Sequence, residues 1–331
     1  MKTPFVIILL SGFILLLSCP CTAQSPQETS AAERDPNLPE INISFSEHGE
    51  DPNSANSSEN ENSDPFTDPQ TDREISEPQI PEFIDASDSL FSTYVNEKHL
   101  VNYNELRRHR GDLIQICRTL ESIHPAHIMS LERDGKIAFW INTYNLCILK
   151  LIVDHYPIEP KFYMIFYPDN SIMQISNAWT KQYFDVMGLE YTLNEIQNEL
   201  LLDRFNDPRI CFALSYASLG GGRLNSYAYR PDRIDEQLDQ QVRGYLTTNF
   251  GYKLDKEERI IYLSNLFATH REVFLKSEYD EIKKFRSYPD HERAWLNFLI
   301  SYIPEEDVKF IENNSCSIRM IRFDWTLDET K

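Results

Sequence analysis

The clearest pattern of apolar positions lies in residues 131–155 and predicts a long helix that ends at Tyr156-Pro157. When successive residues are turned by about 100°, one continuous apolar arc contains Trp140, Ile141, Tyr144, Cys147, Ile148, Leu151 and Ile152. Asn145 falls inside this arc and Asn142 lies at its edge. Because an unpartnered buried amide costs about 1–3 kcal/mol, we expect both side chains to brace another backbone segment. A ligand contact is the alternative.

Shorter patterns predict the remaining elements. They are helices over 86–96, 104–122 and 234–246, strands over 99–103, 260–263 and 320–323, a hairpin over 183–191 around Gly188, a capping box at Thr192–Glu195 that opens a helix to Leu202, and a helix cap at Ser264. Helical and strand periods alternate without a repeat or a long linker. The chain from residue 85 to 331 is therefore predicted to be α+β, a helix-rich single domain around a small β-sheet.

An apolar run of strand length, 209–215, follows the turn signal Asp207-Pro208 and predicts a central strand covered on both faces. Directly behind it, residues 216–223 contain three consecutive glycines that allow a sharp turn and a close approach. Such a loop can cradle an anion on its amides, here with help from Arg223, although no dinucleotide or P-loop motif is present and a plain turn is the alternative. The candidate ligand-binding or site-lining residues are Asn142, Asn145, Arg209, Ser215, Tyr216, Ser218, Arg223 and Asp324.

The N-terminus predicts export. Residues 5–17 form an apolar run that is too short for a comfortable membrane span and is followed by small and helix-breaking residues, which is typical of a signal peptide over residues 1–23. We prefer cleavage after Ala23, because Pro20 would directly follow the lipidated residue in the alternative, a lipid anchor at Cys19. The mature chain is expected to be secreted or periplasmic and to contain no transmembrane span.

Residues 24–84 predict a disordered acidic arm rich in Pro, Ser and Asn. Between Gln24 and Phe83 there are 15 acidic residues against two arginines, and eight prolines. Such a segment cannot bury enough apolar surface to offset its ordering entropy. The whole chain carries a formal charge of −20, which disfavours nucleic acid as a partner, whereas 41% apolar residues suffice for a well-filled core beyond the arm.

The cysteines and histidines predict neither a metal site nor a cofactor. Four cysteines lie beyond the leader, at positions whose spacing requires no disulfide: Cys117, Cys147, Cys211 and Cys316. The first three are expected to face the core, and Cys316 to lie in a polar turn. His124 and His127 straddle a proline instead of sharing a helix face, so they do not form a ligand pair.

Several separated segments resemble the domain of unknown function 547 family, over about residues 86–328. The resemblance rests on segments 138–145, 179–201 and 207–214, on the Ser264 segment, and on the closing Asp324-Trp325-Thr326-Leu327. It implies a scaffold on which a Cys and a His of neighbouring elements could perform thiol hydrolase or transferase chemistry.

This chain lacks the residues that such chemistry would need. Tyr216 and Gly221 stand where the family usually has two loop thiols, and Gln197-Asn198 stands where a helix usually has an acidic residue and a His. The Ser264 segment also departs, with Thr269-His270 and Val273-Phe274 where the family usually has Trp-Tyr and Asp-Phe.

The departures predict a degenerate family member, a non-catalytic module that binds a small molecule or a surface partner. The alternative is an extracytoplasmic hydrolase or transferase in which Ser215 or Ser218 pairs with His270 as a relocated nucleophile and base. An enzyme of this kind should place one of the two serines within hydrogen-bond reach of a histidine.

Overall fold

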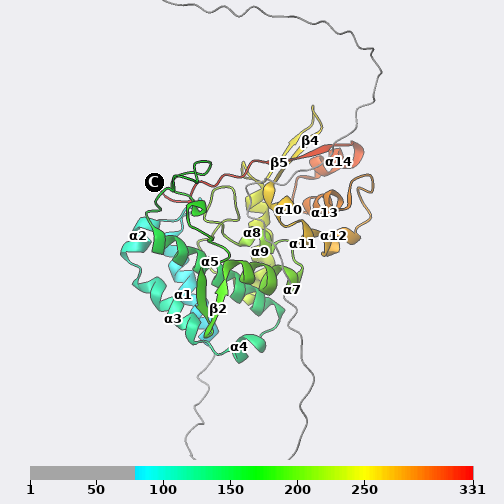
Figure 1. Ribbon diagram of the computed structural model, residues 1–331. Coiled ribbons are helices and arrows are strands. Elements are labelled where there is room, and N and C mark those ends of the chain that lie inside the picture. The colour runs from blue at the N-terminus through cyan, green and yellow to red at the C-terminus, as the bar shows by residue number, and fades with distance from the viewer. Residues whose placement is uncertain (1–78, 331) are drawn as a thin grey trace, which may run out of the picture. The chain divides into compact units, whose positions relative to one another are not determined.

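The computed structural model describes residues 79–330, which form a helix-rich body (Figure 1). Its helices and strands, in chain order, are α1 Gln79–Tyr94, α2 Tyr103–Arg108, α3 Gly111–Ser122, α4 Pro125–Met129, α5 Arg133–His155, the 3-10 turn η1 Ile172–Gln174, β1 Tyr183–Val186, β2 Leu189–Thr192, α6 Leu193–Glu195, the π-helix η2 Ile196–Leu202, α7 Asp203–Phe205, α8 Ile210–Ala213, the 3-10 turn η3 Pro231–Arg233, α9 Ile234–Leu246, β3 Tyr252–Asp255, β4 Ile260–Ser264, α10 Asn265–Thr269, α11 Arg271–Leu275, α12 Glu278–Glu281, α13 Asp290–Leu299, α14 Glu305–Asn313 and β5 Ser317–Ile321.

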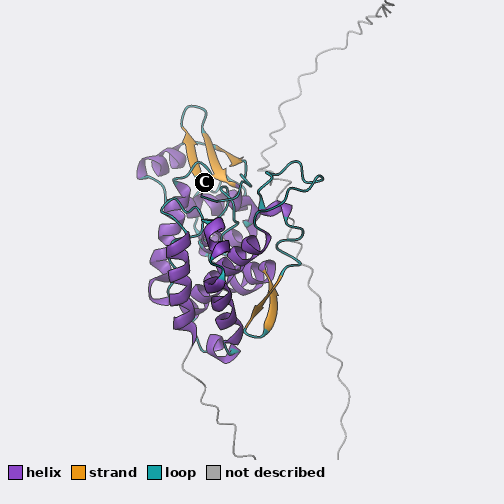
Figure 2. Ribbon diagram, turned by 90° about the vertical axis from the view of Figure 1, so that its left-hand side faces the viewer, coloured by secondary structure: helices purple, strands orange, loops and turns teal. Residues whose placement is uncertain are grey.

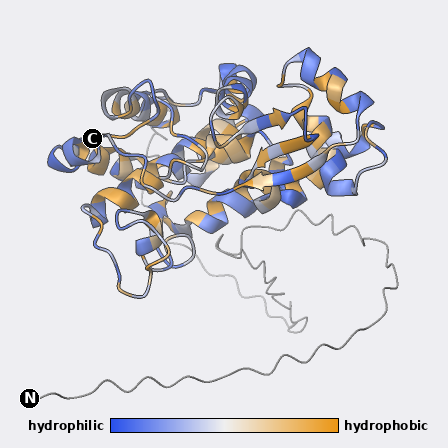
Figure 3. Cartoon of the chain, turned by 90° about the horizontal axis from the view of Figure 1, so that it is seen from above, coloured by the Kyte–Doolittle hydropathy of each residue, from blue (hydrophilic) through white to orange (hydrophobic). Residues whose placement is uncertain are grey.

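The predicted long helix is α5, and it forms the centre of the molecule. Buried residues make up 17 of its 23 positions, so it has no solvent-facing stripe over most of its length. It contacts α1, α2, α3, α9 and η2. In Figure 3 many helices have a hydrophobic side beside a hydrophilic one, as expected for helices that pack on a common core. By length and composition α5 could cross a membrane, but 89% of its most apolar stretch is buried inside the protein, as expected for a core helix.

The strands form two small sheets at the periphery of the helices (Figure 2). β1 and β2 pair antiparallel and are joined by Met187 and Gly188, both with positive φ, which matches the twist of a tight hairpin. β4 lies between β3, which it pairs with antiparallel, and β5, which it pairs with in parallel. The predicted α+β class of a helix-rich single domain is confirmed.

Several local predictions are also confirmed. The Thr192 hydroxyl accepts from the Glu195 amide while the Glu195 carboxylate accepts from the Thr192 amide, which completes the capping box that opens α6. The Ser264 hydroxyl accepts from the Leu266 amide and caps α10. The predicted helix 234–246 is α9, and the strand predicted over 260–263 is β4.

The predicted start of the domain at residue 85 was too late. α1 is described from Gln79, and Ile80, Phe83 and Ile84 are buried in the core at helical spacing. The boundary was misplaced because Pro81 and Glu82 suit the first turn of a helix as well as they suit an acidic arm. The predicted leader and the remainder of the predicted arm lie outside the described residues.

The central strand predicted over 209–215 is wrong. Residues 210–213 form the short helix α8, and the chain becomes extended at Leu214. Ile210 to Leu214 are completely buried, so the run carries no periodicity by which a strand differs from a helical turn. The turn is started by Asp207, whose carbonyl accepts from the Ile210 amide and whose carboxylate accepts from the Arg209 amide.

Three further boundaries differ from prediction. The helix expected over 104–122 is broken between α2 and α3, and the strand expected over 99–103 is reduced to isolated bridges of Val101 with Val95 and Glu329. The last strand, β5, begins and ends earlier than predicted. In each case contacts between distant segments set the backbone conformation, and such contacts cannot be predicted from local periodicity.

Candidate functional site

Two amides on α5 hold the loops that surround the candidate site. Asn145 donates from Nδ2 to the Ala213 carbonyl (3.0 Å) and accepts from the Ser215 amide at Oδ1 (2.9 Å). Asn142 makes the same pair of bonds with the carbonyl and amide of Tyr229, at 2.8 and 2.9 Å. Both amides are therefore fully engaged with backbone, which confirms the expectation that they brace other segments.

The glycine-rich loop packs closely against protein instead of leaving its amides free. The Leu219 amide donates to the Thr326 carbonyl and the Gly220 amide to the Asp324 carbonyl, both at 2.9 Å. A Cβ on Gly220 would lie 2.4 Å from the Asp324 amide nitrogen, and one on Gly222 would lie 2.1 Å from the Leu214 carbonyl oxygen. The glycines thus permit a close approach to the C-terminal segment and to the end of α8. In the predicted anion cradle, the amides of Leu219 and Gly220 are not open to an anion, because both are bonded to protein carbonyls.

Three of the positions at which this chain differs from the family pattern, Tyr216, Gln197 and His270, meet in space. The Tyr216 hydroxyl donates to Gln197 Oε1 (3.2 Å) and lies 2.8 Å from His270 Nε2. All three side chains are buried. A residue in the loop after α8, one on η2 and one at the end of α10 therefore form one polar cluster, which we call the central cluster.

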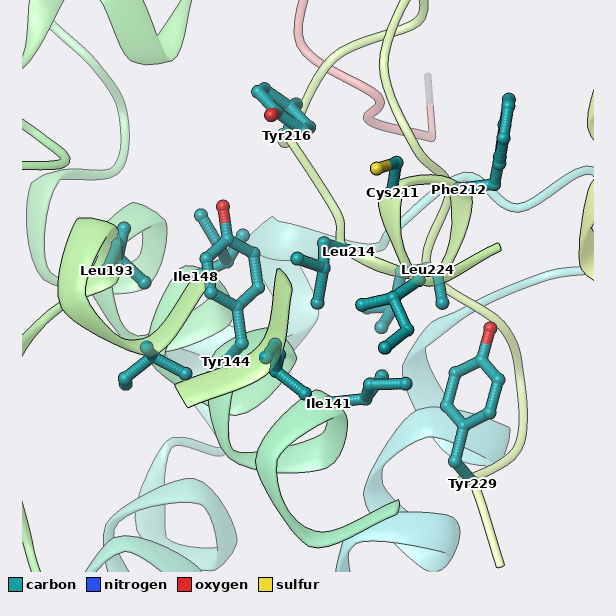
Figure 4. Packing of buried hydrophobic residues seen from close by; sticks show 14 of the residues in the cluster. Ile141, Tyr144, Ile148, Leu193, Cys211, Phe212, Leu214, Tyr216, Leu224 and Tyr229 are labelled. Atoms are coloured by element: carbon teal, nitrogen blue, oxygen red, sulfur yellow. The ribbon is translucent and has the colours of Figure 1, made fainter. Parts of the chain in front are cut away.

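The central cluster continues down to α5. Tyr144 points from α5 toward the segment that carries Tyr216 (Figure 4), and its hydroxyl donates to the same Gln197 Oε1 at 3.4 Å. Trp179 Nε1 in turn donates to the Tyr144 hydroxyl at 3.3 Å. Burial raises the pKa of Tyr216 well above its usual value, and burial also raises the pKa of Tyr144. Both phenols are therefore neutral, hydrogen-bonding groups at physiological pH.

Gly221, at the position of the second usual thiol, packs closely against Tyr216. A Cβ on Gly221 would lie 2.5 Å from Tyr216 Cβ and 3.0 Å from Ser218 Oγ. The loop therefore has no room for a side chain at 221 in this conformation. Asn198, at the position of the usual histidine, donates to Asn194 Oδ1 at 2.8 Å and accepts from Gln197 Nε2 at 3.5 Å.

The serines of the alternative hypothesis have other surroundings. Ser215 Oγ accepts from the Ala217 amide at 3.1 Å, and the buried Ser218 Oγ has no hydrogen-bond partner. Within residues 79–330, neither serine is hydrogen-bonded to a histidine. Asp324 Oδ1 accepts from the Thr326 amide, and burial lowers the pKa of the half-buried Arg223.

Arg209 belongs to a different place, an open cleft of about 450 Å³. Its guanidinium forms ion pairs with Asp207 at 2.8 Å, Asp235 at 2.7 Å and Asp239 at 3.0 Å. Burial opposes its charge, but the hydrogen bonds to these carboxylates outweigh burial and raise the pKa of Arg209. With its donors bound to three carboxylates, Arg209 orders the turn before α8 and the start of α9. The candidate residues thus fall into two groups, of which only those near the loop approach the central cluster.

The thiols are buried in more places than predicted. Within residues 79–330 all four cysteines are free, and Cys316, expected in a polar turn, is 4% exposed because its segment packs under Tyr288. Burial raises the pKa of Cys147 and of Cys211 well above the usual thiol value, and raises that of Cys117 to about 11. Within residues 79–330, no group of three or more His, Cys, Asp or Glu could hold a metal ion.

Residues 128–246 match the family model described as "Protein of unknown function, DUF547", which supports the resemblance that the sequence predicted. The matched part contains α5, the first hairpin, η2, α8, the glycine-rich loop and α9, and so most of the central cluster, whereas His270 lies beyond it. No curated protein and no solved structure matches the chain.

Two features were missed at the sequence level. Gln197, Tyr144 and Trp179 were not candidates, although Gln197 stands at a departure from the family and this could have indicated it. The other feature is the loop between α5 and η1, where large apolar side chains are exposed: Phe162 by 90%, Ile165 by 74% and Phe166 by 84%. Its signal was a run of six apolar and aromatic residues, 162–167, between Pro160 and Pro168.

Proposed function

We propose that this chain is a non-catalytic binding module, exported from the cytoplasm, which keeps its family's scaffold without thiol chemistry. The observation that carries the proposal is the state of Tyr216. At the position of the usual loop thiol stands a buried phenol whose hydroxyl contacts Gln197 and His270. A phenol with a raised pKa cannot replace a thiolate, and its contacts are those of a structural hydrogen-bond network.

The exposed loop between α5 and η1 also supports a binding function. Monomeric soluble proteins rarely expose several large apolar side chains together, and such patches mark binding surfaces. Phe162, Tyr163, Ile165 and Phe166 are such a group within five consecutive positions, and each is more than half exposed. Export is inferred from the apolar run at 5–17, and the mass of the mature chain after expression with its leader distinguishes cleavage at Ala23 from lipidation at Cys19.

The direct test treats the folded chain with a thiol alkylator and with a fluorophosphonate probe, and then offers ester, amide and glutamine substrates. We expect slow labelling of Cys147 and Cys211, because burial protects them, and no turnover that either reagent abolishes. Unfolded protein is the control in which all thiols should react. Turnover that is lost on alkylation of one cysteine, or on labelling of Ser215 or Ser218, would overturn the proposal.

A further inference from the structure

The loop between α5 and η1 has an ordered base and an exposed tip. At the base the buried Gln174 accepts from the Lys161 amide at 2.8 Å and donates to the carbonyls of Met164 (3.3 Å) and Pro168 (3.2 Å). Lys161 Nζ also donates to Ser176 Oγ at 2.6 Å. The loop is therefore shaped from within by one amide side chain, which leaves the side chains of the tip free to point outward.

The same base is tied to the C-terminal end of the chain. Asn170 donates to one carboxylate oxygen of Glu329 at 2.6 Å, and the Tyr156 hydroxyl donates to the other at 3.0 Å. The ring of Tyr167 packs edge-on against Trp325, with centroids 6.3 Å apart. In Figure 1 the green loop after α5 accordingly lies beside the C-terminus. The two ends of the loop are held, and only the tip projects.

The tip has the chemistry of a segment that enters lipid. From 162 to 166 it contains no charged side chain. Part of its backbone is bonded internally, because the Met164 amide donates to the Lys161 carbonyl (2.9 Å) and the Tyr167 amide to the Met164 carbonyl (3.1 Å). Internal bonding matters because an unpaired backbone group costs several kcal/mol in hydrocarbon. The nearest cation, Lys161, stands at the base, at the level where a lysine meets the lipid headgroups.

A lipid surface fits these observations better than a protein groove does. The tip is a projection with few polar side chains for directional contacts. Its Tyr163 is of the amphipathic type that prefers the interface between headgroups and acyl chains, and the exposed phenylalanines supply apolar surface.

We propose that residues 162–166 form a membrane-contacting loop that inserts into the headgroup region of neutral lipid. This inference rests on the proposed binding function and specifies its partner. The contact is reversible, since one small apolar segment behaves like a single acyl chain and not like a spanning helix. It is driven by apolar burial and not by charge, because the chain carries a formal charge of −20 and anionic lipid would repel it.

The test uses the chain from Gln24 onward, which retains every described residue, and vesicles of pure phosphatidylcholine. We expect Phe162→Ser/Phe166→Ser to lower the vesicle partition coefficient at least tenfold. The matched control is Met129→Ser, which removes a side chain that is 76% exposed at the end of α4, away from the loop; it should change partitioning less than about twofold. Thermal unfolding of each variant checks that the fold is retained.

Salt and lipid charge separate the driving forces. Binding should be unchanged when salt rises from about 0.1 M to about 1 M, and anionic lipid should not strengthen it. Absence of vesicle binding by the unsubstituted chain, or binding that the double substitution leaves intact, would overturn the inference. If the chain instead self-associates through these residues, and the double substitution abolishes that association, the lipid inference falls while the binding function stands. Turnover that the alkylator or the fluorophosphonate abolishes would, by contrast, overturn the proposed binding function itself.

Discussion

The central cluster and the loop after α5 use their side chains in opposite ways. In the cluster, polar groups are buried and joined to one another, as Tyr216 is to Gln197 and His270. In the loop, apolar groups such as Phe162 and Phe166 are held out toward solvent by a polar base. Each region reverses the usual preference of its side chains for surface or core, so each needs a physical reason.

The physical reasons differ between the two regions: one is structural, and the other concerns binding. The polar groups of the cluster stabilise the packing between the loop, η2, α10 and α5, so their burial is explained within the molecule. Of the exposed rings of the tip, Phe162 and Tyr163 pack edge-on with centroids 5.2 Å apart, which leaves both more than half exposed, so we infer that a partner explains their exposure. On the proposed function, the central cluster serves stability and the loop serves binding, so substitutions should affect the two regions very differently.

The largest effect is expected at Gly222. Alanine there would place Cβ 2.1 Å from the Leu214 carbonyl oxygen, and the backbone would have to move to relieve this clash. Gly222→Ala should therefore lower the free energy of unfolding by roughly 3 kcal/mol or more. The matched control is Gly244→Ala on the exposed face of α9, where nothing lies within 4 Å. This control should raise stability by about 0.5–1 kcal/mol through helix propensity. Equal effects in chemical denaturation would show that the glycine-rich loop is not closely packed.

The next effect concerns pH and the buried carboxyl of Asp328. Burial raises the pKa of Asp328 to about 6, although the Tyr103 hydroxyl donates to it at 2.8 Å. Because the folded state holds this proton more tightly than the unfolded state, the stability that Asp328 contributes is fully present below its unfolded pKa of about 3.9 and is lost as pH rises through the folded value. The loss between about pH 4 and about pH 7 should be roughly 3 kcal/mol.

Asp328→Asn should remove that part of the pH dependence, since the amide does not titrate. Asp324→Asn, in the same C-terminal segment, should keep it because Asp328 is still present. Urea denaturation across this pH range measures both variants. A slope in Asp328→Asn as steep as that of the unsubstituted chain would contradict the assignment.

A smaller loss is expected from Asn145→Leu, which leaves the Ala213 carbonyl and the Ser215 amide without partners. It should destabilise the domain by about 1–3 kcal/mol although leucine is more hydrophobic. Asn104→Leu, at an exposed position of α2, is the control and should stay within about 0.5 kcal/mol. A denaturation midpoint for Asn145→Leu that is unchanged or raised is the result that would show the amide is not a brace.

The smallest effect on stability should come from the loop. Phe162→Ser/Phe166→Ser removes two exposed rings that contribute nothing to the core, so the free energy of unfolding should change by less than about 0.5 kcal/mol. A loss as large as that of Asn145→Leu would mean that the rings are packed in solution, and the contrast between the two regions would disappear.

The sequence predicted those parts that depend on local chemistry. The periodicity of α5, the turn at Gly188 and the capping box at Thr192 each require particular residues at particular spacings, and each is present as predicted. The buried amide of Asn145 was also predictable, because a polar group within an apolar arc must find partners.

What the sequence could not predict depends on distant contacts. Residues 210–214 are buried on every side, and such a run has no period to identify α8. The contact of Tyr216 with His270 joins positions 54 apart, and nothing local to either one indicates it. The loop tip was missed for the opposite reason, since an apolar run is expected to be buried and only the fold shows that Phe162 and Phe166 are exposed.

The central claim, that binding resides in the loop, is tested most directly by a tryptophan placed at its tip. All four native tryptophans are buried: Trp140, Trp179, Trp295 and Trp325. Phe166→Trp therefore adds one exposed tryptophan, whose fluorescence emission reports on the surroundings of the tip. On phosphatidylcholine vesicles we expect this emission to shift to the blue, with no shift for the unsubstituted chain or for Met129→Trp. Emission of Phe166→Trp that stays at its solvent-exposed wavelength, or a shift of the same size for Met129→Trp, would contradict the account.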